Sequence, residues 1–272
     1  ARQERPVVVT STTVFADLVQ QVAGDLVEVR SLVGIGGDPH THEPRPSDAI
    51  AVAEADLVVD GGLGLSPWLA PLLRARRGPT VDLGQAAIEV ARTTGGTVDP
   101  HVWMAPDLVA RYYLPVIADA LRGLVPDAAP VLARRTRQAQ DALRALDAEI
   151  ALILDVIPPH RRLLVTSHDA YSYFADAYDL TVVGTVVGSS TEEEPSARTV
   201  AALIDQITAL EVPAVFIEST VNPQVIRRIA ADAGVAVGAP LYGDSLGPPG
   251  SGAETYADML RTNARHLADG LR

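Results

Sequence analysis

The sequence contains no cysteine and no lysine, and all 22 of its basic residues are arginine. The missing thiol excludes disulfide frameworks, cysteine nucleophiles, zinc–thiolate sites and cysteine-ligated iron–sulfur clusters. The missing amine excludes a P-loop lysine and Schiff-base chemistry. Any transition-metal site in this chain must therefore be built from histidine, aspartate and glutamate.

The chain also lacks long apolar runs and an excess of positive charge. No stretch approaches the ~18 consecutive apolar residues of a membrane-spanning helix, and the formal net charge is −12. Such an acidic chain does not fit a nucleic-acid-binding protein, which needs a basic face. With 272 residues, 47% of them hydrophobic, the chain can form one large domain or two lobes.

Segments typical of strands and of helices alternate along the chain. The β-branched run at 7–9 is followed by residues 12–23, where apolar residues recur four positions apart. After the loop at 34–46, Ser47 is the expected N-cap of a short helix. The alternation predicts an α/β fold with parallel sheets. From residue 163 onward, elements are expected at 163–165, 170–178, 180–187, 195–210, 214–217, 222–233, 235–237 and 252–271.

Residues 126–157 have a different pattern. Apolar residues recur at spacings of three and four from Leu143 to Ile157, and neither glycine nor proline interrupts the segment between Pro130 and Pro158. This pattern predicts an amphipathic helix about 45 Å long that bridges two lobes. The predicted organisation is an N-terminal lobe at 1–125, a linker helix at 126–157 and a C-terminal lobe at 158–272.

Four residues after expected strands are candidate metal ligands. The tripeptide Asp-Pro-His occurs twice and ends at His40 and His101, so that a stiff turn presents each imidazole. His168 follows a strand in the string Thr-Ser-His-Asp-Ala-Tyr, and Asp244 follows the last strand in Tyr-Gly-Asp-Ser. Ligands bind beyond the carboxyl ends of strands in open α/β sheets, which favours a functional role for these side chains.

These strings, in this order and around so long a helix, resemble the metal-binding solute-binding proteins of zinc and manganese ABC importers, the cluster A-I family. The resemblance covers nearly the whole chain. It implies two Rossmann-like lobes with parallel sheets joined by one long rigid linker helix. It also implies two ligands from each lobe, namely His40, His101, His168 and Asp244. Unlike many zinc-binding members, the chain has no histidine-rich loop, because residues 84–98 contain no histidine.

Three imidazoles and one carboxylate favour zinc over manganese, which prefers more oxygen ligands. In the resembling family the position of His168 is glutamate in many manganese members, but both metals occur with three histidines and one carboxylate. Manganese therefore stays open as the alternative. The resemblance implies a periplasmic or otherwise extracytoplasmic protein that binds one ion per chain and delivers it to a permease. We expect a monomer with no nucleic-acid partner, and a lipid anchor in a precursor stays open.

An alternative hypothesis is a zinc hydrolase with three protein ligands and an activated water. It needs an open coordination position, which Asp244 would fill, and the sequence has no His-Glu-x-x-His pattern. A nucleotide-dependent enzyme would need a phosphate-binding glycine loop, and the glycines at 34–37 and 61–64 lack its spacing. We therefore expect no enzymatic activity.

We also predict the roles of two further polar residues near the candidate ligands. His42 lies two residues past His40, about 7 Å along an extended segment, so it is expected at the rim rather than on the metal. Glu218 stands at a strand end and is expected to accept a hydrogen bond from a ligand histidine, which would fix the tautomer of that histidine.

The sequence also predicts the surroundings of the two remaining histidines and of two aromatic residues. His160 lies among proline and arginine residues in a turn, and His266 lies on the last helix. Both are expected to be solvated. Trp103 and Tyr171 follow candidate ligands closely in the sequence and are expected to form walls that exclude water from the metal.

Overall fold

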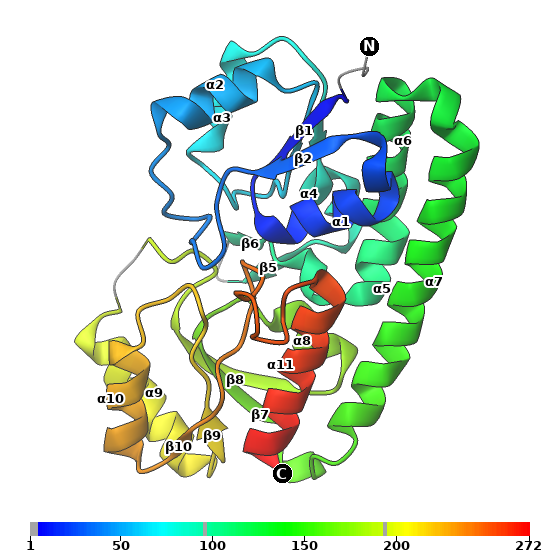
Figure 1. Ribbon diagram of the computed structural model, residues 1–272. Coiled ribbons are helices and arrows are strands. Elements are labelled where there is room, and N and C mark those ends of the chain that lie inside the picture. Colours follow the sequence, from blue (N-terminus) through cyan, green and yellow to red (C-terminus); the bar gives the residue numbers. More distant parts are fainter. Residues whose placement is uncertain (1–4, 95–96, 193–194) are drawn as a thin grey trace. The chain divides into compact units, whose positions relative to one another are not determined.

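The computed structural model describes residues 5–94, 97–192 and 195–272, and the chain divides into two compact units. Unit 1 comprises residues 1–102 and 106–145, and unit 2 comprises residues 103–105 and 146–272. One helix of 26 residues, α7 (Ala129–Leu154), begins in unit 1 and ends in unit 2 (Figure 1). The finer boundaries at 125 and 158 stay a prediction.

Unit 1 is built on a parallel sheet with the strand order β2-β1-β3-β4. The two central strands are rich in valine and leucine because helices cover the sheet, and Val8, Val9 and Val58 are fully buried. The predicted α/β class with parallel strands is thereby confirmed. The strands are β1 (Val7–Thr10), β2 (Glu28–Ser31), β3 (Leu57–Asp60) and β4 (Thr80–Asp82).

The first two helices of unit 1 begin in different ways. The hydroxyl of Thr12 accepts a hydrogen bond from the Phe15 N–H at the start of α1. The predicted cap at Ser47 is wrong, because α2 already begins at Pro46, whose fixed φ suits the first helical position. These helices are α1 (Thr13–Ala23), α2 (Pro46–Glu54), α3 (Leu69–Ala75) and α4 (Leu83–Ala86).

Residues 84–125, where the sequence predicts no regular element, contain a pair of antiparallel strands and a helix. The paired strands are β5 (Arg92–Thr94) and β6 (Thr97–Asp99). The helix runs from α5 (Pro106–Leu108) into α6 (Leu114–Leu124) through a wider π turn, in which the Leu114 N–H bonds to Val109 O five residues back. Pro115 would normally predict a helix break, and the π turn next to it lets the helix continue.

The linker helix is three residues shorter at each end than predicted. Residues Pro126–Ala128 form a 3₁₀ turn before α7, and the helix ends at Leu154 rather than at the prolines. Its last residue is capped from unit 2, because the guanidinium of Arg162 donates to the Leu154 carbonyl oxygen at 3.0 Å. The same guanidinium donates to the Ile157 carbonyl oxygen, beyond the helix end, at 3.2 Å. Such capping satisfies carbonyl groups that have no partner within the helix.

Unit 2 repeats the strand arrangement of unit 1. β7 pairs with β8, β9 pairs with β10, and an isolated parallel bridge from Thr166 to Phe216 joins the two pairs. In both units the first strand therefore lies between the second and the third. The elements are β7 (Leu163–His168), α8 (Ser172–Ala177), β8 (Thr181–Val187), α9 (Ala197–Ala209), β9 (Ala214–Val215), α10 (Gln224–Ala233), β10 (Ala236–Val237) and α11 (Tyr256–Leu271).

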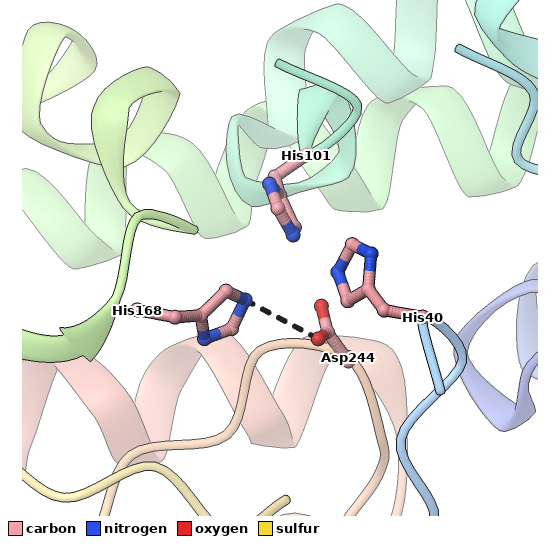
Figure 2. A group of neighbouring side chains, drawn as sticks. All are labelled: His40, His101, His168 and Asp244. Carbon is pink, nitrogen blue, oxygen red and sulfur yellow. Dashed lines mark ion pairs between the residues drawn. The ribbon is translucent and has the colours of Figure 1, made fainter. Parts of the chain in front are cut away.

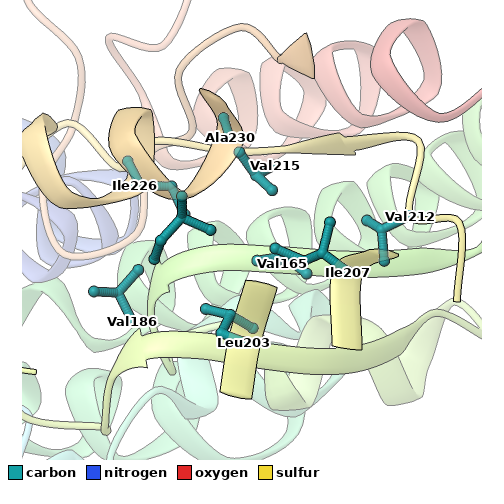
Figure 3. Packing of buried hydrophobic residues seen from close by; sticks show 9 residues of the cluster. Val165, Val186, Leu203, Ile207, Val212, Val215, Ile226 and Ala230 are labelled. Carbon is teal, nitrogen blue, oxygen red and sulfur yellow. The ribbon is translucent and has the colours of Figure 1, made fainter. Parts of the chain in front are cut away.

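The core of unit 2 forms where α9 and α10 pack against these strands. Figure 3 shows Leu203 and Ile207 of α9 and Ile226 of α10 among Val165 and Val215 of the strands. Because these side chains are buried, they fix the positions of the strand ends that carry the polar residues described below. Across the described ranges, no helix combines the length and the apolar character that crossing a bilayer requires.

We predict that Ile207→Ala destabilises the metal-free protein by about 2–5 kcal/mol, because it removes buried methyl groups and leaves a cavity. The matched control is Leu210→Ala, three residues further on, where the side chain is 52% exposed. We expect that control to change stability by no more than about 0.5 kcal/mol. Urea unfolding monitored by circular dichroism measures both, and equal effects would contradict the assigned core.

Candidate metal-binding residues in each unit

Both Asp-Pro-His tripeptides of unit 1 fold into the same turn. The Asp38 carboxylate accepts a hydrogen bond from the His40 N–H at 2.8 Å, and Asp99 accepts one from the His101 N–H at 2.9 Å. An aspartate bonded to the backbone two residues on makes a tight local turn, and the intervening proline stiffens it. The repeated sequence therefore presents each imidazole from the same rigid support.

The two imidazoles of unit 1 lie next to each other in the protein interior. Their ring centroids are 5.4 Å apart, the rings are tilted by 54°, and His40 and His101 are 2% and 0% exposed (Figure 2). His101 Nδ1 lies 2.8 Å from the Asp99 carboxylate. This contact places the Nδ1 proton toward Asp99 and leaves Nε2 with a lone pair for a metal ion.

Unit 2 brings together His168, Glu218 and Asp244. The Nδ1 atom of His168 lies 2.7 Å from Oε2 of Glu218. Its Nε2 atom lies 3.3 Å from Oδ2 of Asp244, and Figure 2 marks this ion pair. The backbone N–H of His168 donates to Oε1 of Glu218 at 2.8 Å. All three residues are at most 1% exposed. The predicted contact between Glu218 and a candidate ligand histidine is present.

The strand order explains this arrangement. His168 ends β7 and Glu218 follows β9, and these strands are neighbours through the bridge from Thr166 to Phe216. Parallel strands end at the same edge of a sheet, so the two side chains meet although 50 residues separate them. Asp244 follows β10, which pairs with β9, and so reaches the same edge.

The two buried carboxylates beside His168 need two positive charges to offset them. Burial by itself would lower the pKa of His168, but the carboxylates of Glu218 and Asp244 outweigh burial and raise that pKa well above its usual range. An imidazolium between two carboxylates still leaves one negative charge in the interior. A divalent cation on Nε2 would replace the proton and offset both carboxylates, so these residues suit a metal ion.

Two buried aromatic residues adjoin Asp244 within unit 2. The Trp103 indole N–H donates to the Gly243 carbonyl at 3.0 Å, and the ring is fully buried. Tyr171 is 1% exposed and packs edge-on against Phe174, with ring centroids 6.2 Å apart. Both side chains are buried, as expected for residues that keep water away from a metal site.

The other histidines are engaged elsewhere or lie at the surface. His42 Nε2 lies 3.0 Å from the Asp48 carboxylate, and its ring packs against Trp68 at 4.6 Å. It thus supports the first turn of α2. His160 is exposed, as expected. His266 is partly exposed, and its Nδ1 lies 2.7 Å from the Pro240 carbonyl oxygen in an exposed contact.

Known proteins similar to this chain bind transition metals. The family described as "Zinc-uptake complex component A periplasmic" matches residues 8–270. The manganese-binding lipoprotein MntA of Halalkalibacterium halodurans is 34% identical over 97% of this chain and 88% of that protein. The manganese ABC transporter substrate-binding lipoprotein PsaA of Streptococcus pneumoniae is 28% identical, with the same shares of each chain covered.

Solved structures share the fold over nearly the whole length. The periplasmic zinc-binding protein TroA from Treponema pallidum matches with a TM-score of 0.94 and 28% identity, covering 98% of this chain and 99% of that one. A mutant, manganese-bound form of a periplasmic metal-binding protein from Candidatus Liberibacter asiaticus matches with a TM-score of 0.88 and 26% identity, covering 98% and 100%. The similarity therefore includes both units and the helix that joins them.

We predict that Glu218→Gln lowers the pKa of His168 in the metal-free protein, because it removes one of the two carboxylate charges that favour the imidazolium. NMR titration of the His168 ring measures the shift. The matched control Asp205→Asn removes an exposed carboxylate from α9 and should leave this pKa unchanged.

The sign of the effect on stability follows from the same pKa. The raised folded-state pKa stabilises the protein fully below about pH 6.5, the value in an unfolded chain, and this contribution is lost as pH rises through the folded-state pKa. We expect that fall in stability to be smaller in Glu218→Gln. An unchanged His168 pKa in the variant would contradict the charge argument.

Proposed function

The chain belongs to the zinc-uptake complex component A family, the metal-binding solute-binding proteins of ABC importers, and from this premise we propose a complete metal site for it. Proteins of this family are not enzymes; they bind a zinc or manganese ion outside the cytoplasmic membrane and deliver it to the importer. The proposed ligands, two from each unit, are His40, His101, His168 and Asp244.

The observation that carries this proposal is the orientation of the His168 imidazole in unit 2. Oε2 of Glu218 lies 2.7 Å from Nδ1 of His168, so the other ring nitrogen, Nε2, points toward Asp244 at 3.3 Å. A histidine held in this way by an outer carboxylate is typical of metal sites, since the outer contact fixes the tautomer and raises the basicity of the ligand atom. Asp99 supports His101 of unit 1 in the same manner.

We propose zinc as the preferred ion. Three neutral nitrogen donors and one carboxylate suit tetrahedral Zn²⁺, with Zn–N distances of about 2.0–2.1 Å. The general stability order also places zinc above manganese. Manganese is the second candidate, because the relatives from Halalkalibacterium and Streptococcus are named as manganese-binding proteins. The ion is bound as cargo, one per chain, and a monomer suffices because a single chain supplies the whole ligand set.

We predict that His101→Ala weakens Zn²⁺ binding by at least about a hundredfold, because it removes one of four ligands and leaves Asp99 buried without its imidazole. Competition with a chromophoric chelator measures the affinity, and circular dichroism checks the fold. The control His160→Ala changes an exposed histidine and should bind like wild type. If His101→Ala retains wild-type affinity in a folded protein, the ligand assignment is wrong.

We predict that His168→Glu narrows the preference for Zn²⁺ over Mn²⁺. The substitution exchanges one nitrogen donor for a carboxylate, which offers manganese the additional oxygen ligands it prefers. The variant also places a third carboxylate beside Glu218 and Asp244 and should weaken the metal-free fold, so the affinity ratio is the relevant quantity. Competition titrations with both ions, at one pH and ionic strength, give this ratio. A ratio that stays constant or rises would contradict a role for His168 in selectivity.

A further inference from the structure

The Tyr171 side chain has a buried hydroxyl group that nothing in the fold of unit 2 explains. The residue is 1% exposed, and within the ranges that the structure describes its hydroxyl oxygen has no hydrogen-bond partner. A buried hydroxyl in this condition destabilises a folded protein, and a phenylalanine would fill the same volume without that cost. The tyrosine therefore requires a reason outside the packing of the metal-free protein.

The hydroxyl lies beside the backbone that leads into Asp244. A β-carbon added to Gly243 would lie 3.9 Å from the Tyr171 hydroxyl oxygen and 3.4 Å from Oε2 of Glu218. The edge-on contact with Phe174 holds the ring in this place. Burial and the nearby charges of Glu218 and Asp244 raise the pKa of Tyr171 well above its usual range, so the group keeps its proton and acts as a donor.

Of the two carboxylates near this donor, Glu218 already faces His168 with both of its oxygens, one in a hydrogen bond and one in an ion pair. Oε1 accepts the His168 N–H at 2.8 Å, and Oε2 lies 2.7 Å from Nδ1. Asp244 directs Oδ2 toward His168 Nε2, the atom that would bind the metal. When a metal ion takes the place between these two atoms, the other Asp244 oxygen, Oδ1, becomes the acceptor that best matches the hydroxyl.

We propose that Tyr171 is a positioning residue of the metal site. Its hydroxyl donates to Oδ1 of Asp244 in the metal-bound protein and thereby limits that carboxylate to one metal–oxygen bond. A single oxygen from Asp244 keeps the coordination number low, which suits Zn²⁺, whereas a bidentate carboxylate would favour Mn²⁺. This inference rests on the proposed function, because it assigns a further residue to the same site.

The test compares Tyr171→Phe with Tyr178→Phe, each of which removes one phenolic oxygen. Tyr178 donates to the Asp147 carboxylate at 2.7 Å and serves as the matched control. Tyr171→Phe should weaken Zn²⁺ binding by about tenfold, the effect of one hydrogen bond to a charged group, and lower the Zn²⁺/Mn²⁺ affinity ratio. The melting temperature of its metal-free form should stay the same or rise. Tyr178→Phe should show the opposite pattern, with a lower metal-free melting temperature and unchanged affinity.

Two results would overturn the inference. Affinities of Tyr171→Phe for both ions within about twofold of wild type would show that the hydroxyl does not act on the site. A lower melting temperature of metal-free Tyr171→Phe would show that the hydroxyl is already bonded without metal and has a structural role. Failure of the proposed function is a separate result, in which wild type binds neither ion or His101→Ala binds like wild type.

Discussion

The imidazole of His168 and its two carboxylates impose the constraint around which unit 2 is arranged. Glu218 and Asp244 are at most 1% exposed, and buried carboxylates are tolerated only beside a positive charge or strong donors. His168 supplies both, through its ring and through its backbone N–H. The three residues lie at the ends of strands, so the sheet must bring those ends together before the charges can be buried.

In unit 1 a buried carboxylate also contacts an imidazole, but the two residues are only two positions apart in the sequence. Asp99 accepts hydrogen bonds from both the backbone and the ring of His101, and Glu218 accepts one from the backbone of His168 and forms an ion pair with its ring. In each unit a buried carboxylate thus fixes the tautomer of an imidazole before any metal arrives. Preorganised ligands lose less conformational freedom when the ion binds, which favours tight capture of a scarce ion.

The hydrophobic cores hold these polar groups in place. Leu203 and Ile207 of α9 pack against the strand that ends at His168, and the matching core of unit 1 packs around Val9 and Val58. The helix α7 contributes residues to both units. Each proposed pair of ligands lies within one unit and therefore depends on the packing of that unit.

Local features of the fold and of the candidate ligands could be predicted from the sequence. The Asp-Pro-His turns close over two residues, and the alternation of strands and helices follows from side-chain periodicity. The same reasoning named no element at 106–124, where the structure has α5, a π turn and α6. It also placed a helix cap at Ser47, one residue inside the true start at Pro46.

Only the tertiary structure decided which distant groups meet. The contact between His168 and Glu218 spans 50 residues and depends on β7 lying next to β9, an order that periodicity cannot supply. The same holds for the Tyr171 hydroxyl, which has no hydrogen-bond partner among the described residues and lies beside Gly243, a neighbour that only the tertiary structure brings there. Sequence determined the candidate metal ligands and the local partner Asp99 of His101, because the Asp-Pro-His turns close over two residues. Packing decided the outer partner of His168, because its contact with Glu218 forms only when the sheet does.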